Sequence, residues 1–364
     1  MMFPALKSVA FPWLPARTLL LVRHGSHAYG TQVATSDEDF KGIAIPPSAY
    51  FYGFTQKFEQ AEVKVPDMVV YDIRKFFNLA ADCNPNILEV LWVDPSDHVV
   101  CTPLAEKLLS SRQLFLSRKA RFTFFGYAQS QLKRIKGHYR WLKDPPKAPP
   151  SRAESGLPER PVIPGEQLLA AQAAVQKKLD AWEWKHLEDI DPAARIAVQS
   201  SFEELVAELM LFRDENARHR MAARTLSYDE NFIELLDRER HHQARQRDWE
   251  QYQLWLKQRN PARSELEAKF GYDTKHAMHL VRLIRMGREI LELGEVRVKR
   301  PDREELLAIR QGLWSYEALL EWAESQEPIL ETLYQRSSLP KSPDKAALDR
   351  LCQTLVEEAL RTLP

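Results

Sequence analysis

The chain has 364 residues, of which 44% are hydrophobic and 28% charged, a composition typical of a soluble globular protein with enough length for two domains. Its 51 Lys and Arg residues balance 51 Asp and Glu residues, so no overall positive field recruits nucleic acid, and such a site must come from local clustering. The three isolated cysteines form no paired metal or redox spacing, which fits a reducing cytosol, and no apolar run approaches the length of a membrane span. We therefore expect a cytoplasmic protein with no membrane partner.

The first structured element is a short apolar run at residues 18–23, which is predicted to be a buried strand that ends at a Gly-Ser turn. Gly25 lacks a side chain, so a phosphate can approach the backbone there. The backbone amide and hydroxyl of Ser26 can donate hydrogen bonds to phosphate oxygens. The turn therefore predicts a binding site for the phosphates of a nucleotide.

Acidic residues follow the turn in a pattern that suits a divalent metal. Asp37 and Asp39 are two residues apart, and on a predicted strand over residues 37–45 both side chains point to the same face. Adjacent carboxylates repel each other unless they are protonated or bridged by cations, and oxygen ligands suit Mg²⁺ better than zinc. Asp72 lies in a predicted strand at 67–73 that could pair with the first. We expect it to be the third carboxylate of a two-metal site and to take the proton of the attacking hydroxyl.

A helical pattern extends over residues 104–139, and its later part has the strongest local charge bias of the chain. A run of like charge is usually a solvated helix face. Here aromatic residues interrupt the run, and this mixture can bind phosphate backbones and stack bases. Gln131 and Lys133 are the candidate acceptor-binding residues in this segment.

Residues 144–166 are rich in proline and lack apolar periodicity, which is typical of a stiff connector or an extended arm. From residue 167 onward the chain is predicted to be almost wholly helical. Within it, Lys275, His279 and Arg282 share one face of a helix that is otherwise largely apolar. Spacing alone leaves two partners open for them, a bound anion or acidic residues of other helices.

Taken together, the Gly-Ser turn, Ser-Asp-x-Asp at 36–39 and the later strand Asp resemble the DNA polymerase β superfamily of nucleotidyltransferases. Several segments resemble, more narrowly, the bacterial and phage polymerase-β-like family that is linked with RNA ligases and RNA repair: 25–30, 36–42, 71–76, 84–89, 126–128, 131–133 and 271–279. The resemblance implies metal binding by Asp37, Asp39 and Asp72 and triphosphate binding by Gly25 and Ser26. It also favours a nucleotide or acceptor phosphate as the partner of Lys275, His279 and Arg282.

These observations predict an α/β (α+β) polymerase-β-like nucleotidyltransferase core with a large, mainly helical C-terminal region. The expected division is a catalytic core at 1–100, a basic and aromatic helical segment at 101–143, a proline-rich connector at 144–166 and a helical substrate-binding domain at 167–364. The expected enzyme uses two Mg²⁺ ions, or Mn²⁺, to transfer a nucleoside monophosphate from an NTP to an acceptor hydroxyl, with an RNA end as the first acceptor.

Other interpretations fit parts of the sequence. A protein or a small molecule could replace RNA as the acceptor, and a catalytically silent RNA-binding module could keep the same fold. Residues 20–25 also resemble the opening of the histidine phosphatases, in which His24 would carry the phosphate. That family needs a second arginine and a second histidine, and the sequence has no convincing counterpart downstream.

Overall fold

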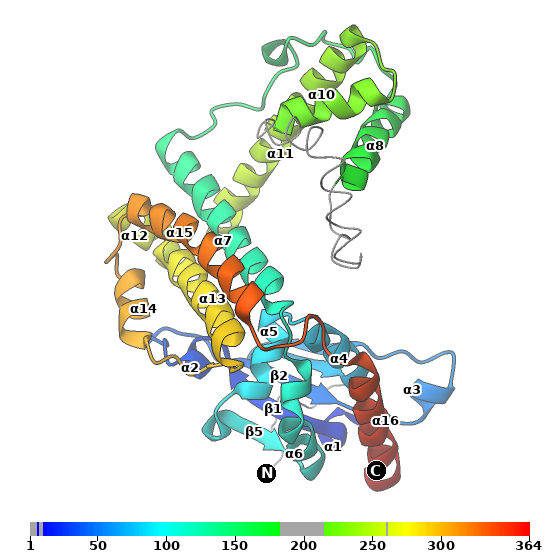
Figure 1. Cartoon of the computed structure of the whole chain (residues 1–364). Helices are drawn as coiled ribbons and strands as arrows, with labels where there is room; N and C mark the ends of the chain where they lie inside the picture. The colour runs from blue at the N-terminus through cyan, green and yellow to red at the C-terminus, as the bar shows by residue number, and fades with distance from the viewer. Residues whose placement is uncertain (1–5, 7–9, 183–214, 260) are drawn as a thin grey trace. The chain divides into compact units, whose positions relative to one another are not determined.

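A computed structural model describes residues 6, 10–182, 215–259 and 261–364 (Figure 1). The chain forms two compact units, one made of Met1–Lys143 with Asn260–Pro364 and the other of Asp144–Arg259. Residues 260–364, which we expected within a single C-terminal domain, therefore pack with the N-terminal unit. The predicted helical stretch at 183–214 lies outside the described residues.

A five-stranded mixed sheet forms the base of the first unit, with the strand order β3-β4-β2-β1-β5. β2 pairs with β1 in antiparallel and with β4 in parallel orientation, whereas β3 and β5 are the antiparallel edge strands. The sheet and the helices around it confirm the predicted α+β fold. The strands are β1 (Thr18–His24), β2 (Asp39–Ala44), β3 (Gln60–Lys64), β4 (Asp67–Asp72) and β5 (His98–Cys101).

The central strand β1 is buried on both faces, which is why its sequence is apolar without alternation. Leu20 and Val22 belong to the larger hydrophobic cluster, which extends into the helices, whereas Leu21 belongs to a smaller cluster with Phe40 and Met68. Successive side chains of a strand point to opposite faces, so one short run supplies both clusters.

Helices cover the sheet and continue beyond it, and α7 and α13 lie side by side (Figure 1). At their crossing a Cβ on Gly287 would lie 3.0 Å from Cβ of Phe124, so glycine permits the close approach. The helices of this unit are α1 (Leu14–Arg17), α2 (Gly25–Tyr29), α3 (Ala49–Tyr52), α4 (Ile73–Ala81), α5 (Pro85–Leu88), α6 (Pro103–Ser110), α7 (Ala120–Lys143), α12 (Pro261–Phe270), α13 (Thr274–Leu293), α14 (Arg303–Arg310), α15 (Tyr316–Arg336) and α16 (Lys345–Thr362). Short 3₁₀ turns are η2 (Glu89–Trp92), η3 (Pro95–Asp97) and η4 (Arg112–Phe115).

The second unit is helical in its described part and has small cores of its own. The proline-rich segment packs within this unit, because Leu157 and Ile163 are buried and Arg152 donates to Glu239 at 3.1 Å. It is thus a folded part of the unit, whereas we expected a connector or an extended arm. The elements are η5 (Ala153–Ser155), α8 (Gly165–Trp182), α10 (Glu215–Thr225) and α11 (Glu230–Gln258).

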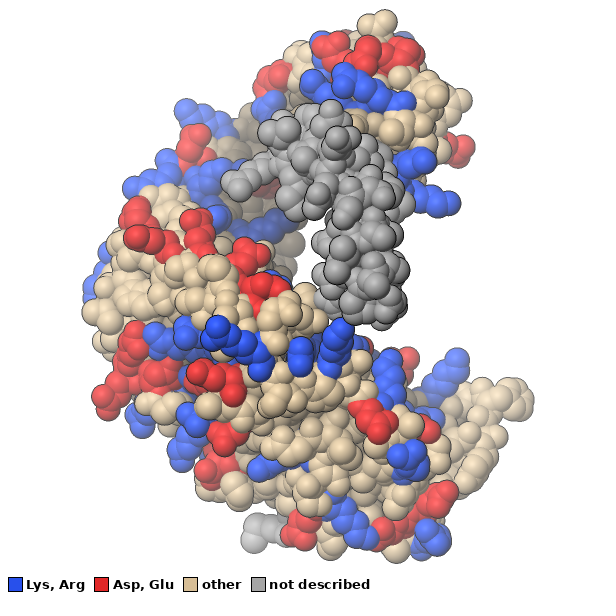
Figure 2. All heavy atoms as spheres, in the orientation of Figure 1, with Lys and Arg blue, Asp and Glu red and all other residues tan. Residues whose placement is uncertain are grey.

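The surface agrees with the balanced charge of the sequence. On the face shown in Figure 2, Lys and Arg side chains are interspersed with Asp and Glu. Among the helices that the structure describes, none combines the length and the apolar character needed to cross a bilayer.

Candidate active site

The Gly-Ser turn lies directly against Asp39. β1 ends at His24, which is the register partner of Asp39 on β2, and α2 begins at Gly25. Gly25 has φ +65°, and a Cβ at this position would overlap the Asp39 carboxylate oxygen Oδ2. Any side chain would therefore be both strained and obstructed, and only glycine lets the turn and the carboxylate meet. Ser26 follows in the half-buried first turn of α2.

A second carboxylate lies beside Asp39 on the neighbouring strand, and it belongs to Asp67. β2 and β4 are parallel and in register, with Asp39 opposite Asp67 and Lys41 opposite Val69. Opposed residues of paired strands point to the same face, so the two carboxylates share a face at the start of both strands. We expected Asp72 to lie beside Asp39 on a paired strand, and in the structure Asp67 has this position.

Asp72 lies at the other end of β4, opposite Ala44. Asp72 is five positions after Asp67, which corresponds to about 16 Å along the strand and, because the side-chain period is two, to the opposite face. Its carboxylate is buried, caps α4 by accepting from the Arg74 backbone N–H at 2.8 Å, and accepts two further bonds of 2.9 Å from the Arg74 guanidinium. This placement corrects the expectation that Asp72 shares a metal site with Asp37 and Asp39.

Charged groups around Asp39 change the pKa of its carboxyl group. Burial raises the pKa of its carboxyl group, and the charges of Asp67 and Asp37 raise it further, whereas Lys41 and Lys275 lower it. Asp37 is exposed in the segment that leads into β2. The three carboxylates therefore repel one another, a situation that a bound cation would relieve.

Lys41 is the basic side chain closest to this group along β2. Burial lowers its pKa to about 8, although the charges of Glu89 and Asp39 act in the opposite direction. Its Nζ donates to the backbone carbonyl of Asn86 at 2.8 Å. The carboxylates and this lysine lie on the same face of β2, since residues 39 and 41 are two apart.

The three residues predicted to share one face of α13 lie in two different environments. Lys275 and His279 are half-buried, and the charge of Lys275 reaches Asp39. Arg282 is buried, and its Nη1 donates to Glu89 Oε1 at 2.6 Å. For Arg282, therefore, the described contact is an acidic residue of another segment, which is the second of the two partners that spacing left open.

Glu89 connects α13 to the end of β1 and to the turn. The Tyr29 hydroxyl donates to Glu89 Oε2 at 2.5 Å, the Arg282 guanidinium lies 3.7 Å from the centre of the Tyr29 ring, and His24 Nε2 lies 3.5 Å from Glu89 Oε2. Burial lowers the pKa of His24 well below its usual value. A phosphatase nucleophile must be reached by its substrate, so the burial of His24 does not support the phosphatase interpretation.

The candidate acceptor-binding residues lie on different faces of α7. Gln131 is half-buried and follows Tyr127 by one turn, and the Tyr127 hydroxyl accepts from Asn84 Nδ2 at 3.0 Å. Lys133 is exposed. It follows Gln131 by two positions, which places the two side chains about 200° apart around the helix axis. The exposed basic positions nearest Lys133 on this helix are Arg134, Lys136 and Arg140.

A histidine and two acids meet at the far end of α7. Among the described residues, His138, Glu267 and Asp273 are the group of three that could hold a metal ion, with one ligand atom of each within 4.8 Å of the others. Asp37, Asp39 and Asp67 do not form a group this close. Sequence reasoning missed His138 and Glu267, because they are 129 positions apart in the chain and no local spacing connects them.

Residues 9–144 match the model of the RlaP family, described as an RNA repair pathway DNA polymerase beta family. This segment is polymerase-β-like. The match covers the sheet, the Gly-Ser turn, the carboxylates and α7, and it confirms the resemblance that the sequence motifs indicated. Neither the curated proteins nor the solved structures contain a match to the chain.

The RNA-repair polymerase β match supports a nucleotidyltransferase, and such enzymes generally use divalent metals and an NTP. Asp67 is the functional candidate that sequence reasoning overlooked. The signal available was its position as the first residue of the strand at 67–72, since parallel strands bring their starting ends together. The sequence does not show that β4 runs parallel to β2, so either end of β4, with Asp67 or Asp72, could have been the one beside Asp39.

Proposed function

We propose that this chain is a metal-dependent nucleotidyltransferase that transfers a nucleoside monophosphate from an NTP to the hydroxyl of an RNA end, releasing pyrophosphate. The observation that carries the proposal is the in-register pairing of Asp39 with Asp67 beside the Gly25 turn. The basic α7 and the family match favour RNA as the acceptor.

The donor set suits a hard divalent cation. Asp37, Asp39 and Asp67 offer carboxylate oxygens alone, and Mg²⁺ and Mn²⁺ prefer such ligands. Burial raises the pKa of Asp39, and the charges of Asp67 and Asp37 raise it further. When bound, two such ions would neutralise charge on the triphosphate and favour ionisation of the attacking hydroxyl.

The surrounding residues would bind and orient the substrates. The amide and hydroxyl of Ser26, at a turn without a side chain at Gly25, would donate to phosphate oxygens. Lys275 and His279 would face the phosphates from α13, where the charge of Lys275 already reaches Asp39. Asp67, exposed at the start of β4, would accept the proton of the acceptor hydroxyl as that oxygen bonds to the α-phosphorus and the bond to pyrophosphate breaks.

Arg282 enters this proposal as a positioning residue. Its buried ion pair with Glu89 joins α13 to the segment that also receives the Tyr29 hydroxyl from α2. The pair therefore fixes the helix that carries Lys275 relative to the Gly25 turn. Gln131 and Lys133 would contact the acceptor from α7.

The test is incubation with each α-labelled NTP and Mg²⁺, with cellular RNA and cellular protein as separate acceptors. Asp39→Asn should abolish transfer, whereas Glu106→Gln, a neutralised exposed carboxylate on α6, should transfer label like the parent. Transfer to RNA by the parent alone supports the proposal. Label on protein would retain the chemistry and replace the acceptor, and no transfer to either by folded protein would contradict it.

A further inference from the structure

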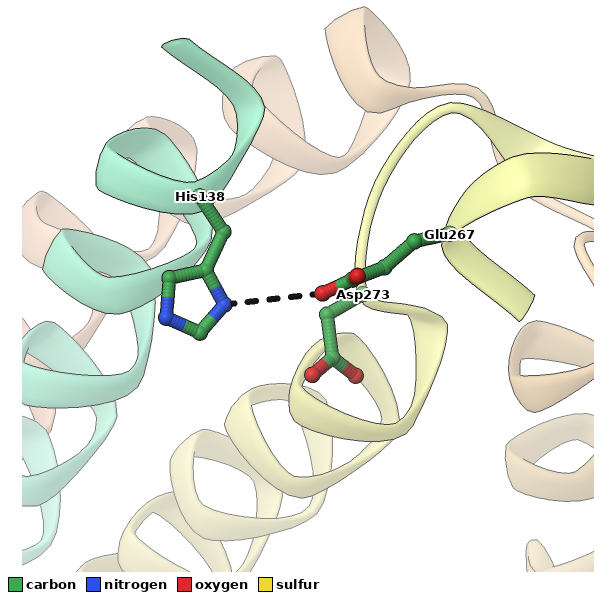
Figure 3. Close-up of side chains that lie close together, drawn as sticks. All are labelled: His138, Glu267 and Asp273. Atoms are coloured by element: carbon green, nitrogen blue, oxygen red, sulfur yellow. Dashed lines mark ion pairs between the residues drawn. The ribbon is translucent and has the colours of Figure 1, made fainter. Parts of the chain in front are cut away.

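We propose that the unit containing the sheet binds a zinc-type metal ion at a second site, formed by His138, Glu267 and Asp273. These residues come from α7, from α12 and from the position that caps α13 (Figure 3). None of them belongs to the carboxylate group at the start of β2 and β4. The inference does not rest on the proposed nucleotidyl transfer.

The ligand atoms already converge. His138 Nδ1 lies 3.6 Å from Glu267 Oε1, and one atom of each of the three side chains lies within 4.8 Å of the other two. Ligands bonded to Zn²⁺ at about 2.1 Å in a tetrahedron are roughly 3.4 Å apart. His138 Nδ1 and Glu267 Oε1 thus have nearly the separation of coordinated atoms. The other pairs would need to contract by at most about 1.4 Å, which is within reach of side-chain rotation.

The two carboxylates are closed to solvent and His138 is half-buried, which distinguishes the site from a surface cluster of acids. Glu267 is 2% and Asp273 0% exposed, and the adjacent His276 is 6% exposed. Buried carboxylates this close to one another need positive charge or hydrogen-bond donors around them. His138 lies beside Glu267 and His276 beside Asp273, and a divalent cation bound among them would add positive charge at a single point between the three helices.

Neighbouring groups hold the ligands in position. Asp273 Oδ1 accepts from the His276 backbone N–H at 3.0 Å, which fixes the carboxylate at the start of α13. His276 Nε2 lies 3.5 Å from Asp273 Oδ2, so His276 is placed to become a fourth ligand or an outer hydrogen-bond partner. The Trp141 ring stacks on His138 with 5.5 Å between ring centres and 26° between planes, which sets the orientation of the imidazole.

The ligand types select the metal. Imidazole nitrogen with carboxylate oxygen suits Zn²⁺ and similar transition ions, whereas Mg²⁺ prefers oxygen ligands and retains water. Lys275 follows Asp273 by two residues. An ion bound here would therefore fix the start of the helix that carries Lys275, by joining it to α7 and α12.

The competing occupant is a proton. A protonated His138 or His276 would also balance part of the negative charge, as an imidazolium–carboxylate pair. The two occupants are distinguishable, because a metal site takes up one ion with a defined coordination geometry and a protonated pair does not.

The experiment uses Co²⁺ as the probe on the full-length, chelator-treated protein. A four- or five-coordinate Co²⁺ site with imidazole gives visible absorption bands far stronger than those of octahedral Co²⁺ on carboxylates and water. We expect one equivalent of Co²⁺ to produce these bands, one equivalent of Zn²⁺ to remove them, and Zn²⁺ alone to raise the melting temperature.

Matched variants assign the bands to this site. Glu267→Gln and His138→Gln should each weaken Co²⁺ binding at least tenfold. Asp39→Asn, which alters the other carboxylate group, and His98→Gln, a half-buried histidine outside the cluster, should leave the bands unchanged. If Glu267→Gln fails to fold, His138→Gln and the zinc-dependent melting shift of the parent carry the test. Folded parent protein without the bands, or bands that persist in either ligand variant, would overturn the proposal.

Discussion

The two candidates for the third carboxylate can be separated by comparing Asp67→Asn with Asp72→Asn. Asp67 is exposed beside Asp39, so neutralising it should change the free energy of unfolding by no more than about 0.5 kcal/mol. Removal of one group that stabilises the transition state usually costs about 10²-fold in rate, so nucleotidyl transfer by Asp67→Asn should fall at least that far.

Asp72→Asn should behave in the opposite way. Asparagine still caps α4, but the charge-assisted bonds of 2.9 Å to the half-exposed Arg74 guanidinium are weakened, which should cost about 1–2 kcal/mol of unfolding free energy. Transfer per folded molecule should be nearly that of the parent. The assays are urea denaturation and transfer rate at saturating NTP. Full activity of Asp67→Asn together with loss of transfer by folded Asp72→Asn would refute the assignment from strand register.

Three further predictions concern charge. The pKa of Asp39 is raised above 3.8, so the folded state binds this proton more tightly than the unfolded state does. The free energy of unfolding should therefore fall as pH rises from 3.8 through the raised pKa. In urea titrations without Mg²⁺, Asp39→Asn should not show this fall and should be more stable than the parent at pH 7. Glu89→Gln and Arg282→Met should each lower the free energy of unfolding by about 3–5 kcal/mol, because each leaves one charge buried and unpaired. The double variant should lose clearly less than the sum of the two. Additive losses in denaturation would show that the pair is not coupled. Lys133→Glu should weaken RNA binding and reduce the salt slope by about 1 or more, and Lys345→Glu on α16 is the control; equal affinities in a salt series would count against an acceptor on α7.

Local sequence determined the parts of the site that depend on short spacing. The short apolar run before Gly25 predicted a buried strand that ends at the Gly-Ser turn, and β1 is that strand. Asp39 follows closely enough for its strand to return beside β1, which brings its carboxylate to the turn. Helical spacing likewise predicted the basic helix that contains Lys133, although the structure divides the predicted stretch at 104–139 into α6, η4 and α7.

Tertiary structure decided which distant residues join that site. Asp67 and Asp72 are the first and last residues of β4, and only the direction in which β4 pairs with β2 decides which of them lies beside Asp39. Likewise, the packing of α7 against α13 brings His138 to Asp273. Strand direction and helix packing are set by burial of apolar surface over the whole unit, so no local pattern of charged residues records them.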